Sequence, residues 1–326
     1  MIIDDIVNGV LSGNRRHLAK AITLIESKTE DNFKQSLKIL DKLVPHSGNS
    51  LRIGITGVPG VGKSTFIESF GLYLINKGHK VAVLAVDPSS KISGGSILGD
   101  KTRMEELSRN ENSFIRPSPS GDTLGGVARK TRESMIACEA AGYDIVLVET
   151  VGVGQSETEV SEMVDIFILL LLPNSGDELQ GIKRGIMELA DIILINKSEG
   201  DNLGKAKLAK SQVETALMML ARREDSWEVP VILTSALTRS GFEDLDKKIA
   251  EFVELRRERA FFEENRKNQY NSWMWSMVFD YIKSKIHGSK EMKEKIHNLQ
   301  KEIIGNTRSP FSAAEELINE LKKIIT

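Results

Sequence analysis

The sequence has one cysteine, few aromatic residues and no long apolar run. Cys138 stands alone, which excludes an intramolecular disulfide framework and a cysteine-rich metal site. The longest apolar run, residues 166–172, is far shorter than the roughly 18 residues that a membrane span needs. Lysine and arginine total 44 against 46 acidic residues, so the net charge does not favour binding to nucleic acid. We expect a soluble, cytoplasmic protein with no membrane or nucleic-acid partner.

The chain divides into three segments by sequence pattern. Hydrophobic residues make up 40% and charged residues 28% of the 326 positions, as in ordinary globular proteins. Residues 1–46 carry apolar side chains at helical spacing and predict an N-terminal helical extension. Residues 47–255 alternate short apolar runs with helix-like segments, and residues 256–326 are charged and helical in pattern. We therefore predict one central domain with helical additions at both ends.

The central segment predicts an α/β fold. Its short β-branched runs are mostly continuous rather than alternating, which is typical of parallel strands buried on both faces. Strand alternating with helix indicates a mostly parallel central sheet flanked by helices. The expected strands are residues 53–56, 81–86, 145–148, 166–172, 192–195 and 231–233. The expected helices between them include residues 64–76, 128–141 and 204–223.

The C-terminal segment leaves two interpretations open. An apolar stripe recurs at helical spacing and consists of Trp275, Phe279, Ile282 and Ile286. The stripe could pack against the chain's own domain, or it could belong to a helical arm that pairs two copies. Two of the three tryptophans lie in this short stretch, and aromatic residues are enriched at interfaces. This favours a dimerisation arm and a homodimer.

The strongest motif is a phosphate-binding loop. Residues 57–64 match G-x-x-x-x-G-K-[ST] in full, after an expected strand and before an expected helix. Its glycines allow backbone N–H groups to turn toward phosphates, and the helix N-terminus adds positive potential. Lys63 can neutralise β and γ oxygens, and the Ser64 hydroxyl can bind Mg²⁺. The motif predicts a P-loop NTPase whose loop residues are Gly57, Val58, Pro59, Gly60, Val61, Gly62, Lys63, Ser64 and Thr65.

Two further loops predict guanine as the base. Asn196, Lys197 and Glu199 follow an expected strand, where GTPases carry N-K-x-D. In that motif the acidic residue accepts from N1–H and N2–H₂ of guanine, two donors that adenine lacks. Glu199 keeps the carboxylate but is one methylene longer, so we expect guanine selectivity to weaken by on the order of 1 kcal/mol. The second loop resembles the one whose backbone N–H binds guanine O6, and it contains Ser235, Ala236 and Leu237.

Residues at two other strand ends predict the hydrolytic site. Glu149 and Gly152 lie where GTPases carry D-x-x-G, so the carboxylate would hold Mg²⁺ through water and the N–H would bind the γ-phosphate. Asp87 ends a strand; alone it could be a turn former, but beside a phosphate loop we expect a metal or water role. Gln155 lies three residues after Gly152 rather than next to it. We therefore expect slow intrinsic hydrolysis that a partner stimulates.

Several longer blocks carry a family resemblance. Besides the phosphate loop they are D-P-S-S at 87–90, S-G-G-S-I-L-G-D-K-T-R-M at 93–104, R-P-S-P-S-G at 116–121, L-G-G-V-A at 124–128, E-T-V-G-V-G-Q-S-E at 149–157 and G-D-E-L-Q-G-I-K at 176–183. With these blocks the chain resembles the MeaB/ArgK/MMAA family over most of residues 10–240. The family consists of G-protein chaperones of adenosylcobalamin-dependent methylmalonyl-CoA mutase. The resemblance implies a GTPase that uses GTP, GDP and Mg²⁺.

The resemblance also implies residue roles and a client. Matching positions place three acidic residues around Mg²⁺ and the attacking water, with Ser64 as a further metal ligand: Asp87, Asp100 and Glu149. Residues 174–183 correspond to an extra switch segment, whose charged members are Asp177 and Lys183. The expected catalytic residues are Lys63, Asp87, Asp100, Glu149 and Lys183. Glu199 departs from the aspartate usual in the family.

The function that the resemblance implies is cofactor delivery. A Mg²⁺-dependent GTPase would gate cobalamin loading of methylmalonyl-CoA mutase or a close relative and protect it, and the mutase would stimulate GTP hydrolysis. Adenosylcobalamin would belong to this acyl-CoA mutase client and not to the chain itself. Related mutases act on methylmalonyl-CoA, isobutyryl-CoA and ethylmalonyl-CoA, and the sequence does not distinguish among these clients.

Three other functions share a phosphate loop. Nickel-insertion GTPases typically carry His-rich or Cys-containing metal sites, whereas this chain has 5 scattered histidines and one cysteine. An ATP-dependent kinase or ATPase of amino-acid transport conflicts with the guanine loops, and the H-R-D motif of kinases is absent from the sequence. A nucleotide-controlled scaffold without turnover is disfavoured by Glu149 and Asp87 beside the loop. A GTPase chaperone is the expected function.

Overall fold

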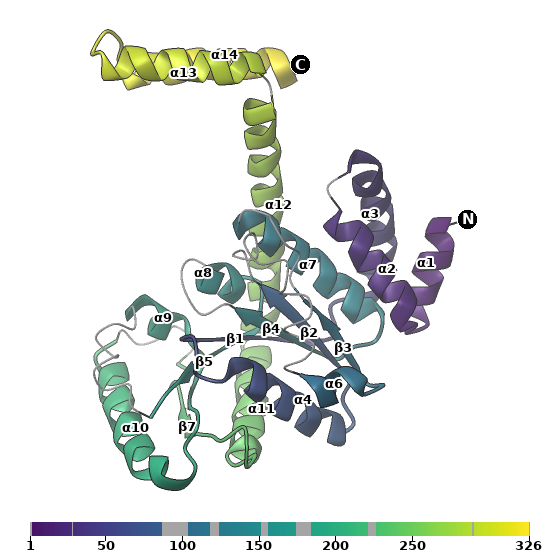
Figure 1. Cartoon of the computed structure of the whole chain (residues 1–326), viewed down its shortest axis with the longest axis vertical. Helices are drawn as coiled ribbons and strands as arrows, with labels where there is room; N and C mark the ends of the chain where they lie inside the picture. Colours follow the sequence, from purple (N-terminus) through teal and green to yellow (C-terminus); the bar gives the residue numbers. More distant parts are fainter. Residues whose placement is uncertain are drawn as a thin grey trace. The chain divides into compact units, whose positions relative to one another are not determined.

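A parallel sheet of seven strands forms the centre of the described chain (Figure 1). The computed structural model describes residues 2–27, 29–86, 104–117, 124–150, 156–173, 184–220, 226–288 and 290–325. The strand order is β3–β2–β4–β1–β5–β6–β7, which places β1 between β4 and β5. The strands are β1 Leu51–Gly57, β2 Val81–Val86, β3 Ser113–Arg116, β4 Ile145–Thr150, β5 Ile166–Leu171, β6 Ile192–Ile195 and β7 Val231–Leu233. Their carboxyl ends share one edge, where open α/β folds bind ligands.

The predicted α/β sheet is confirmed, and one strand is added to it. Each of the six predicted runs forms a strand, because apolar residues on both strand faces are buried between the two helix layers. The added strand is β3, which pairs only with β2 at the edge of the sheet. It has four residues, of which Ser113 and Arg116 are polar. An edge strand this short lacks the continuous apolar signal of the central strands.

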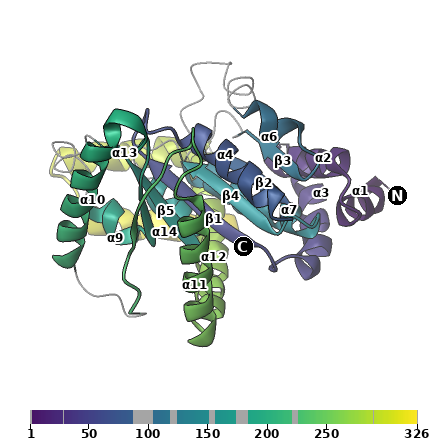
Figure 2. The same ribbon diagram turned by 90° about the horizontal axis from the view of Figure 1, so that it is seen from below.

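Helices cover both faces of the sheet (Figures 1 and 2). On one face, Phe66 and Phe70 of α4 pack edge-on against Phe242 of α11, in a core shared with the strands. The helices around the sheet are α4 Lys63–Asn76, α6 Glu105–Arg109, α7 Leu124–Ala140, α8 Ser156–Ser161, α9 Arg184–Leu189, the 3₁₀ turn η3 Gly200–Asn202, α10 Leu203–Met218 and α11 Phe242–Glu258. Alternating side chains on each strand therefore meet a different helix layer above and below.

Three N-terminal helices pack together and against α7. They are α1 Ile2–Leu11, α2 Arg15–Glu26 and α3 Glu30–Leu43, followed by the 3₁₀ turn η1 Val44–His46. Their apolar stripes are buried, as the helical spacing predicts; fully buried members are Val10, Leu18, Ile22, Ile39 and Leu43. Glu26 connects this layer to the sheet domain, because its carboxylate pairs with Arg116 and its carbonyl accepts from Lys130 Nζ at 2.7 Å.

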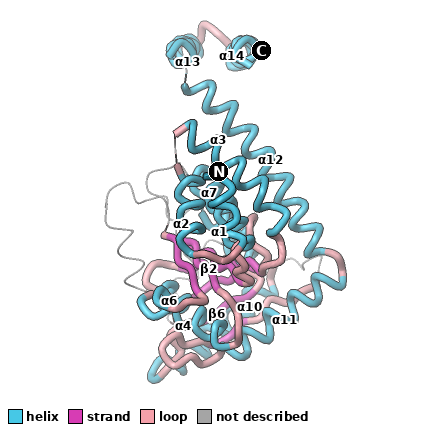
Figure 3. The backbone as a smooth tube through the Cα atoms, turned by 90° about the vertical axis from the view of Figure 1, so that its right-hand side faces the viewer, coloured by secondary structure: helices cyan, strands magenta, loops and turns pink. Residues whose placement is uncertain are grey.

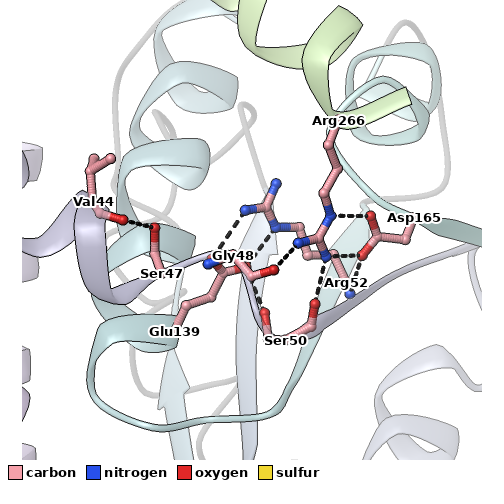
Figure 4. Close-up of polar contacts among 8 residues, drawn as sticks. All are labelled: Val44, Ser47, Gly48, Ser50, Arg52, Glu139, Asp165 and Arg266. Carbon is pink, nitrogen blue, oxygen red and sulfur yellow. Dashed lines mark hydrogen bonds and ion pairs between the residues drawn. The ribbon is translucent and has the colours of Figure 1, made fainter. Parts of the chain in front are cut away.

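A buried carboxylate fixes the segment between η1 and β1 (Figure 4). Glu139 of α7 accepts from Arg52 Nε at 2.6 Å and from Arg52 Nη2 at 3.1 Å. It also accepts from the Ser50 hydroxyl at 2.5 Å and from the Gly48 backbone N–H at 2.7 Å. Burial acts to raise the pKa of Glu139, but these donors, Arg52 above all, outweigh burial and hold the pKa below its usual value. The segment between η1 and β1 is thus tied to α7.

A second carboxylate anchors the start of α12, Phe261–Gly288, to the amino ends of β1 and β5 (Figure 4). Asp165 accepts from Arg266 Nε at 2.8 Å and Nη2 at 2.7 Å, and from the backbone N–H of Arg52 at 2.8 Å. Arg266 also donates to the carbonyls of Gly48 and Ser50. The two arginines and two acids therefore form one buried network at the sheet edge opposite the carboxyl ends.

The chain forms two compact units, Met1–Arg266 and Lys267–Thr326. In the second unit, α13 Lys290–Ile304 and α14 Pro310–Ile325 lie side by side (Figures 1 and 3). Lys295 of α13 pairs with Glu316 at 3.0 Å and with Glu320 at 2.9 Å, both on α14. The helical nature of the C-terminal segment is confirmed, and the division at 1–46, 47–255 and 256–326 stays a prediction. Among the described residues, no helix combines the length and apolar character that crossing a membrane requires.

Candidate functional site

The phosphate loop continues directly from β1 at the carboxyl edge of the sheet. Gly57 has φ +152°, and a Cβ there would lie 2.5 Å from the Leu170 carbonyl oxygen of β5, so the position requires glycine. Gly62, at φ +92°, is the residue before α4. The first N–H groups of a helix have no helical acceptor, and they form an anion-binding end. The loop therefore places the start of a 14-residue helix beside the central strand.

Lys63 lies inside this loop. Its side chain is buried, and Nζ donates to the Gly57 carbonyl at 2.7 Å and to the Val58 carbonyl at 3.4 Å. Burial lowers the pKa of Lys63, while the carboxylates of Glu149 and Glu157 oppose this effect. The ammonium is thus held by loop carbonyls at the position where the motif requires a cation for phosphate oxygens.

Ser64 and Glu149 bring together two side-chain oxygens that can bind a metal ion. The Ser64 hydroxyl donates to Glu149 Oε1 at 2.9 Å, and Glu149 is opposite Ile55 in the β4–β1 register. Mg²⁺ is usually bound by one or two carboxylates together with phosphate oxygens and water, so this hydroxyl–carboxylate pair fits it. The described residues contain no cluster of three or more metal-binding side chains, and a Mg²⁺–nucleotide site of this kind does not need one.

Asn196 and Lys197 lie against the phosphate loop. Asn196 follows β6 and is buried, and its Nδ2 donates to the Val61 carbonyl at 2.9 Å. Lys197 has φ +57°, an uncommon conformation for a residue with a side chain, and its Nζ donates to the Gly60 carbonyl at 2.8 Å. Residues that are 135 and 137 positions apart thus form one continuous site.

The two loops predicted to bind the base also meet. The Ser198 hydroxyl donates to the Thr234 carbonyl at 2.6 Å, and the Ser198 N–H donates to the same carbonyl at 3.1 Å. Oε2 of Glu199 and Oδ1 of Asn196 are buried without hydrogen-bond partners in the described part of the chain. Buried polar atoms usually have partners, so a base edge bearing N–H donors would satisfy the oxygen of Glu199.

The structure brings together only part of the predicted site. The phosphate loop, Glu149, the Asn196–Lys197 pair, Glu199 and the loop after β7 meet at the carboxyl edge. In that last loop Ser235 Oγ accepts from the Thr238 N–H at 3.1 Å, and Leu237 is 75% exposed. Thr65 is exposed in the first turn of α4. Several predicted residues lie outside the described residues: Asp87, Asp100, Gly152, Gln155, Asp177 and Lys183.

One residue of the site was not predicted. Glu157 of α8 is 1% exposed, and both of its carboxylate oxygens are buried without a hydrogen-bond partner among the described residues. Its charge acts on the ammonium of Lys63. The sequence contains a signal for it, because Glu157 is the last residue of the block at 149–157. Spacing alone does not indicate that its side chain turns inward.

Comparison with known proteins identifies the family. A family model described as "Methylmalonyl Co-A mutase-associated GTPase MeaB" matches residues 18–291. The chain belongs to the MeaB family. GTPase ArgK of Escherichia coli is 45% identical to this MeaB-family chain, over 94% of this chain and 92% of ArgK. The mouse (Mus musculus) protein named "Methylmalonic aciduria type A homolog, mitochondrial" is 42% identical over 98% of this chain and 80% of the mouse protein.

A solved structure supports the same assignment. The crystal structure described as "LAO/AO transport system kinase" has a TM-score of 0.80 and 38% sequence identity, and the match covers 98% of this chain and 97% of that one. The predicted family resemblance and the P-loop fold are therefore confirmed. This MeaB-family chain is a GTPase, as the family and the ArgK relative indicate.

Proposed function

We propose that this MeaB-family GTPase is a cytoplasmic, Mg²⁺-dependent chaperone of an adenosylcobalamin-dependent acyl-CoA mutase. It gates cobalamin loading of methylmalonyl-CoA mutase or a close relative and protects the enzyme. The observation that carries the proposal is one continuous site, in which Lys63, the Ser64–Glu149 pair and the Asn196–Lys197 pair surround the same phosphate loop. The description of the matching family model, a mutase-associated GTPase, supports the client.

In this proposal the chain's own residues bind the triphosphate. The loop N–H groups and the first N–H groups of α4 donate to the phosphate oxygens, and Lys63 exchanges its carbonyl partners for β and γ oxygens. Ser64 and Glu149, with Asp87 and Asp100, would hold the metal, which would supply positive charge at these oxygens. The Gly152 N–H donates to the γ-phosphate, as its place in the D-x-x-G position predicts, and Lys183 has the switch role that the family resemblance implies.

Base recognition is assigned to the loops after β6 and β7. Asn196 and Lys197 are already fixed on the phosphate loop by their hydrogen bonds, and Ser198 ties the loops together. Oε2 of Glu199, which has no hydrogen-bond partner among the described residues, is the acceptor for the guanine N–H donors. Ser235, Ala236 and the exposed Leu237 complete the base-binding wall. The longer Glu199 side chain makes selectivity over adenine weaker than an aspartate would.

A homodimer is the second part of the proposal. The apolar stripe of α12 in the second unit is partly exposed: Trp275 is 51% and Phe279 is 55% exposed, and their rings lie 6.0 Å apart. Met274, Val278 and Tyr281 are exposed beside them. An apolar and aromatic surface of this kind is typical of an interface. A second copy of the chain is the partner that we assign to it.

Hydrolysis in the presence of the mutase tests the main proposal. We expect slow GTP turnover by the purified chain and faster turnover after a cognate acyl-CoA mutase is added. Lys63→Ala removes the phosphate counter-charge, so turnover should vanish in both conditions. Lys77→Ala is the matched control, because it removes an exposed lysine just beyond α4. Unchanged turnover in a verified complex contradicts the chaperone role, and normal turnover of Lys63→Ala contradicts the site assignment.

A further inference from the structure

Glu157 is a buried acidic residue for which the proposed function has no role. Its side chain is 1% exposed, and neither carboxylate oxygen has a hydrogen-bond partner in the described part of the molecule. Removing a carboxylate from water without hydrogen bonds is costly, so such groups are usually paired or neutralised. Glu149, the other acidic residue beside Lys63, differs because it accepts from the Ser64 hydroxyl. Glu157 therefore requires a positive charge close to its carboxylate.

The position of α8 directs Glu157 toward the phosphate loop. The helix connects β4 to β5, which run parallel, so it runs back from the carboxyl edge of the sheet. Val160 of α8 lies against β1, with Cγ1 3.0 Å from where a Cβ on Gly54 would be. Glu157 precedes Val160 by three residues and shares its helix face. It is therefore one turn closer to the edge where β1 becomes the loop.

The ammonium of Lys63 lies at this same edge, because its Nζ donates to the carbonyl of Gly57, the last residue of β1. Glu149 on β4 and Glu157 on α8 both act to keep Lys63 protonated, against the effect of burial. Lys63 itself is bound by the neutral carbonyls of Gly57 and Val58. A buried ammonium held by neutral acceptors still requires counter-charge, and the carboxylate of Glu157 supplies it without a direct hydrogen bond.

We propose that Glu157 is a positioning residue that acts through Lys63, as the counter-charge of the ammonium in the nucleotide-free protein and as a competitor of the nucleotide phosphates. The inference rests on the proposed phosphate-binding role of Lys63. Phosphates that bind Lys63 take over the neutralisation, and Glu157 then repels them. The repulsion is larger for GTP than for GDP because the γ-phosphate adds negative charge. Glu157 therefore limits nucleotide affinity and favours release.

The charge-neutral variant Glu157→Gln tests this inference. Dissociation constants of GTP and GDP, each with Mg²⁺, are measured by calorimetry on the full chain. We expect both nucleotides to bind more tightly, GTP on the order of tenfold, which is the effect of one unit charge across about a nanometre of protein. Glu157→Asp keeps the charge and should bind like wild type. Glu159→Gln is the matched control, because it loses the same charge from the same helix but acts on Arg132.

Rescue by the conservative variant separates this role from a structural one. Glu157→Asp restores the charge and should return both dissociation constants to their wild-type values, whereas Glu157→Gln should tighten GTP binding more than GDP binding. A merely structural role would change the binding of both nucleotides alike.

Clear outcomes would overturn the inference. A folded Glu157→Gln protein with wild-type affinities for both nucleotides shows that Glu157 does not act on Lys63. Weaker binding contradicts competition with the phosphates. If Glu157→Gln does not fold, Glu157→Ala carries the same expectations. If wild type binds neither nucleotide, the proposed function itself is wrong. Wild-type binding with no difference between Glu157→Gln and Glu159→Gln defeats this inference alone.

Discussion

Asp165→Asn should destabilise the chain strongly although the side chain keeps its size. Asp165 makes three hydrogen bonds, two from the guanidinium of Arg266 and one from the backbone N–H of Arg52. In the variant, an amide N–H₂ group would face one of these donors, and the remaining oxygen cannot accept all three bonds. Arg266 is 8% exposed, so its charge would stay buried without its carboxylate.

The magnitude follows from burial. Breaking a buried ion pair by removing one partner typically costs about 3–5 kcal/mol, because an uncompensated charge remains inside. A change of about 1 kcal/mol shifts the melting temperature by roughly 2–4 °C in domains of 150–250 residues. We therefore expect Asp165→Asn to lower the melting temperature by roughly 10 °C. The carbonyls of Gly48 and Ser50 still accept from Arg266, which places the loss toward the lower end of the range.

Thermal unfolding followed by circular dichroism measures the effect. The matched control is Asp246→Asn, which removes the same charge from an ion pair with Lys77 that is 2.5 Å long and partly exposed. Exposed pairs contribute about 0–1 kcal/mol, so the control should melt within about 2 °C of wild type. If both variants melt alike, the buried network contributes no more than a surface pair, and the reasoning from burial is wrong.

The acid side of the stability profile gives a second measurement of the same network. Arg52, Ser50 and Gly48 hold the pKa of Glu139 below its ordinary 4.5, although burial acts in the opposite direction. Because the folded pKa is the lower one, the stabilisation from Glu139 is complete above the unfolded value and is lost as pH falls through the folded value. The free energy of unfolding of the wild type should therefore fall below about pH 4.5. Glu139→Gln should be less stable than wild type at neutral pH, and its free energy of unfolding should fall less below about pH 4.5.

Two further predictions concern the base and the dimer. Glu199→Asp should sharpen the preference for GTP over ATP by up to about fivefold, the equivalent of roughly 1 kcal/mol, in a competition titration, because the shorter carboxylate meets the guanine donors without displacing the loop. A lower preference would contradict this geometry. Phe279→Glu adds charge to the exposed stripe of α12, so light scattering should show a monomer in place of a dimer. Glu294→Gln, at an exposed position of α13, is the surface control and should leave the dimer intact. A dimer that persists in Phe279→Glu would show that α12 is not the interface.

The phosphate loop could be predicted in detail because its chemistry is local. Glycines at fixed spacing, Lys63 and Ser64 are contiguous, and the strand before them and the helix after them carry their own patterns. The central strands could also be predicted from the sequence, since burial on both faces leaves continuous apolar runs. Strand β3 could not be predicted, because a four-residue edge strand with polar ends carries no such pattern.

Contacts between distant residues are different in kind. Arg266 meets Asp165 across 101 positions and Ser50 across 216, and a sequence pattern over a few residues does not contain such a pairing. The same applies to Asn196, whose amide reaches the Val61 carbonyl 135 positions away. The motif predicts that Asn196 binds the base, but it does not indicate the hydrogen bond from Asn196 to the phosphate loop.

Local chemistry was therefore enough to assign the nucleotide, the α/β sheet and the family, because each depends on residues that are neighbours along the chain. Folding alone established the partners of the buried charges. Glu157 illustrates the difference: its identity is plain in the sequence, but its burial beside Lys63 arises only when α8 packs on β1. Burial changes the energy of a charge far more than its neighbours in sequence do, so roles that depend on burial emerge only in the folded chain.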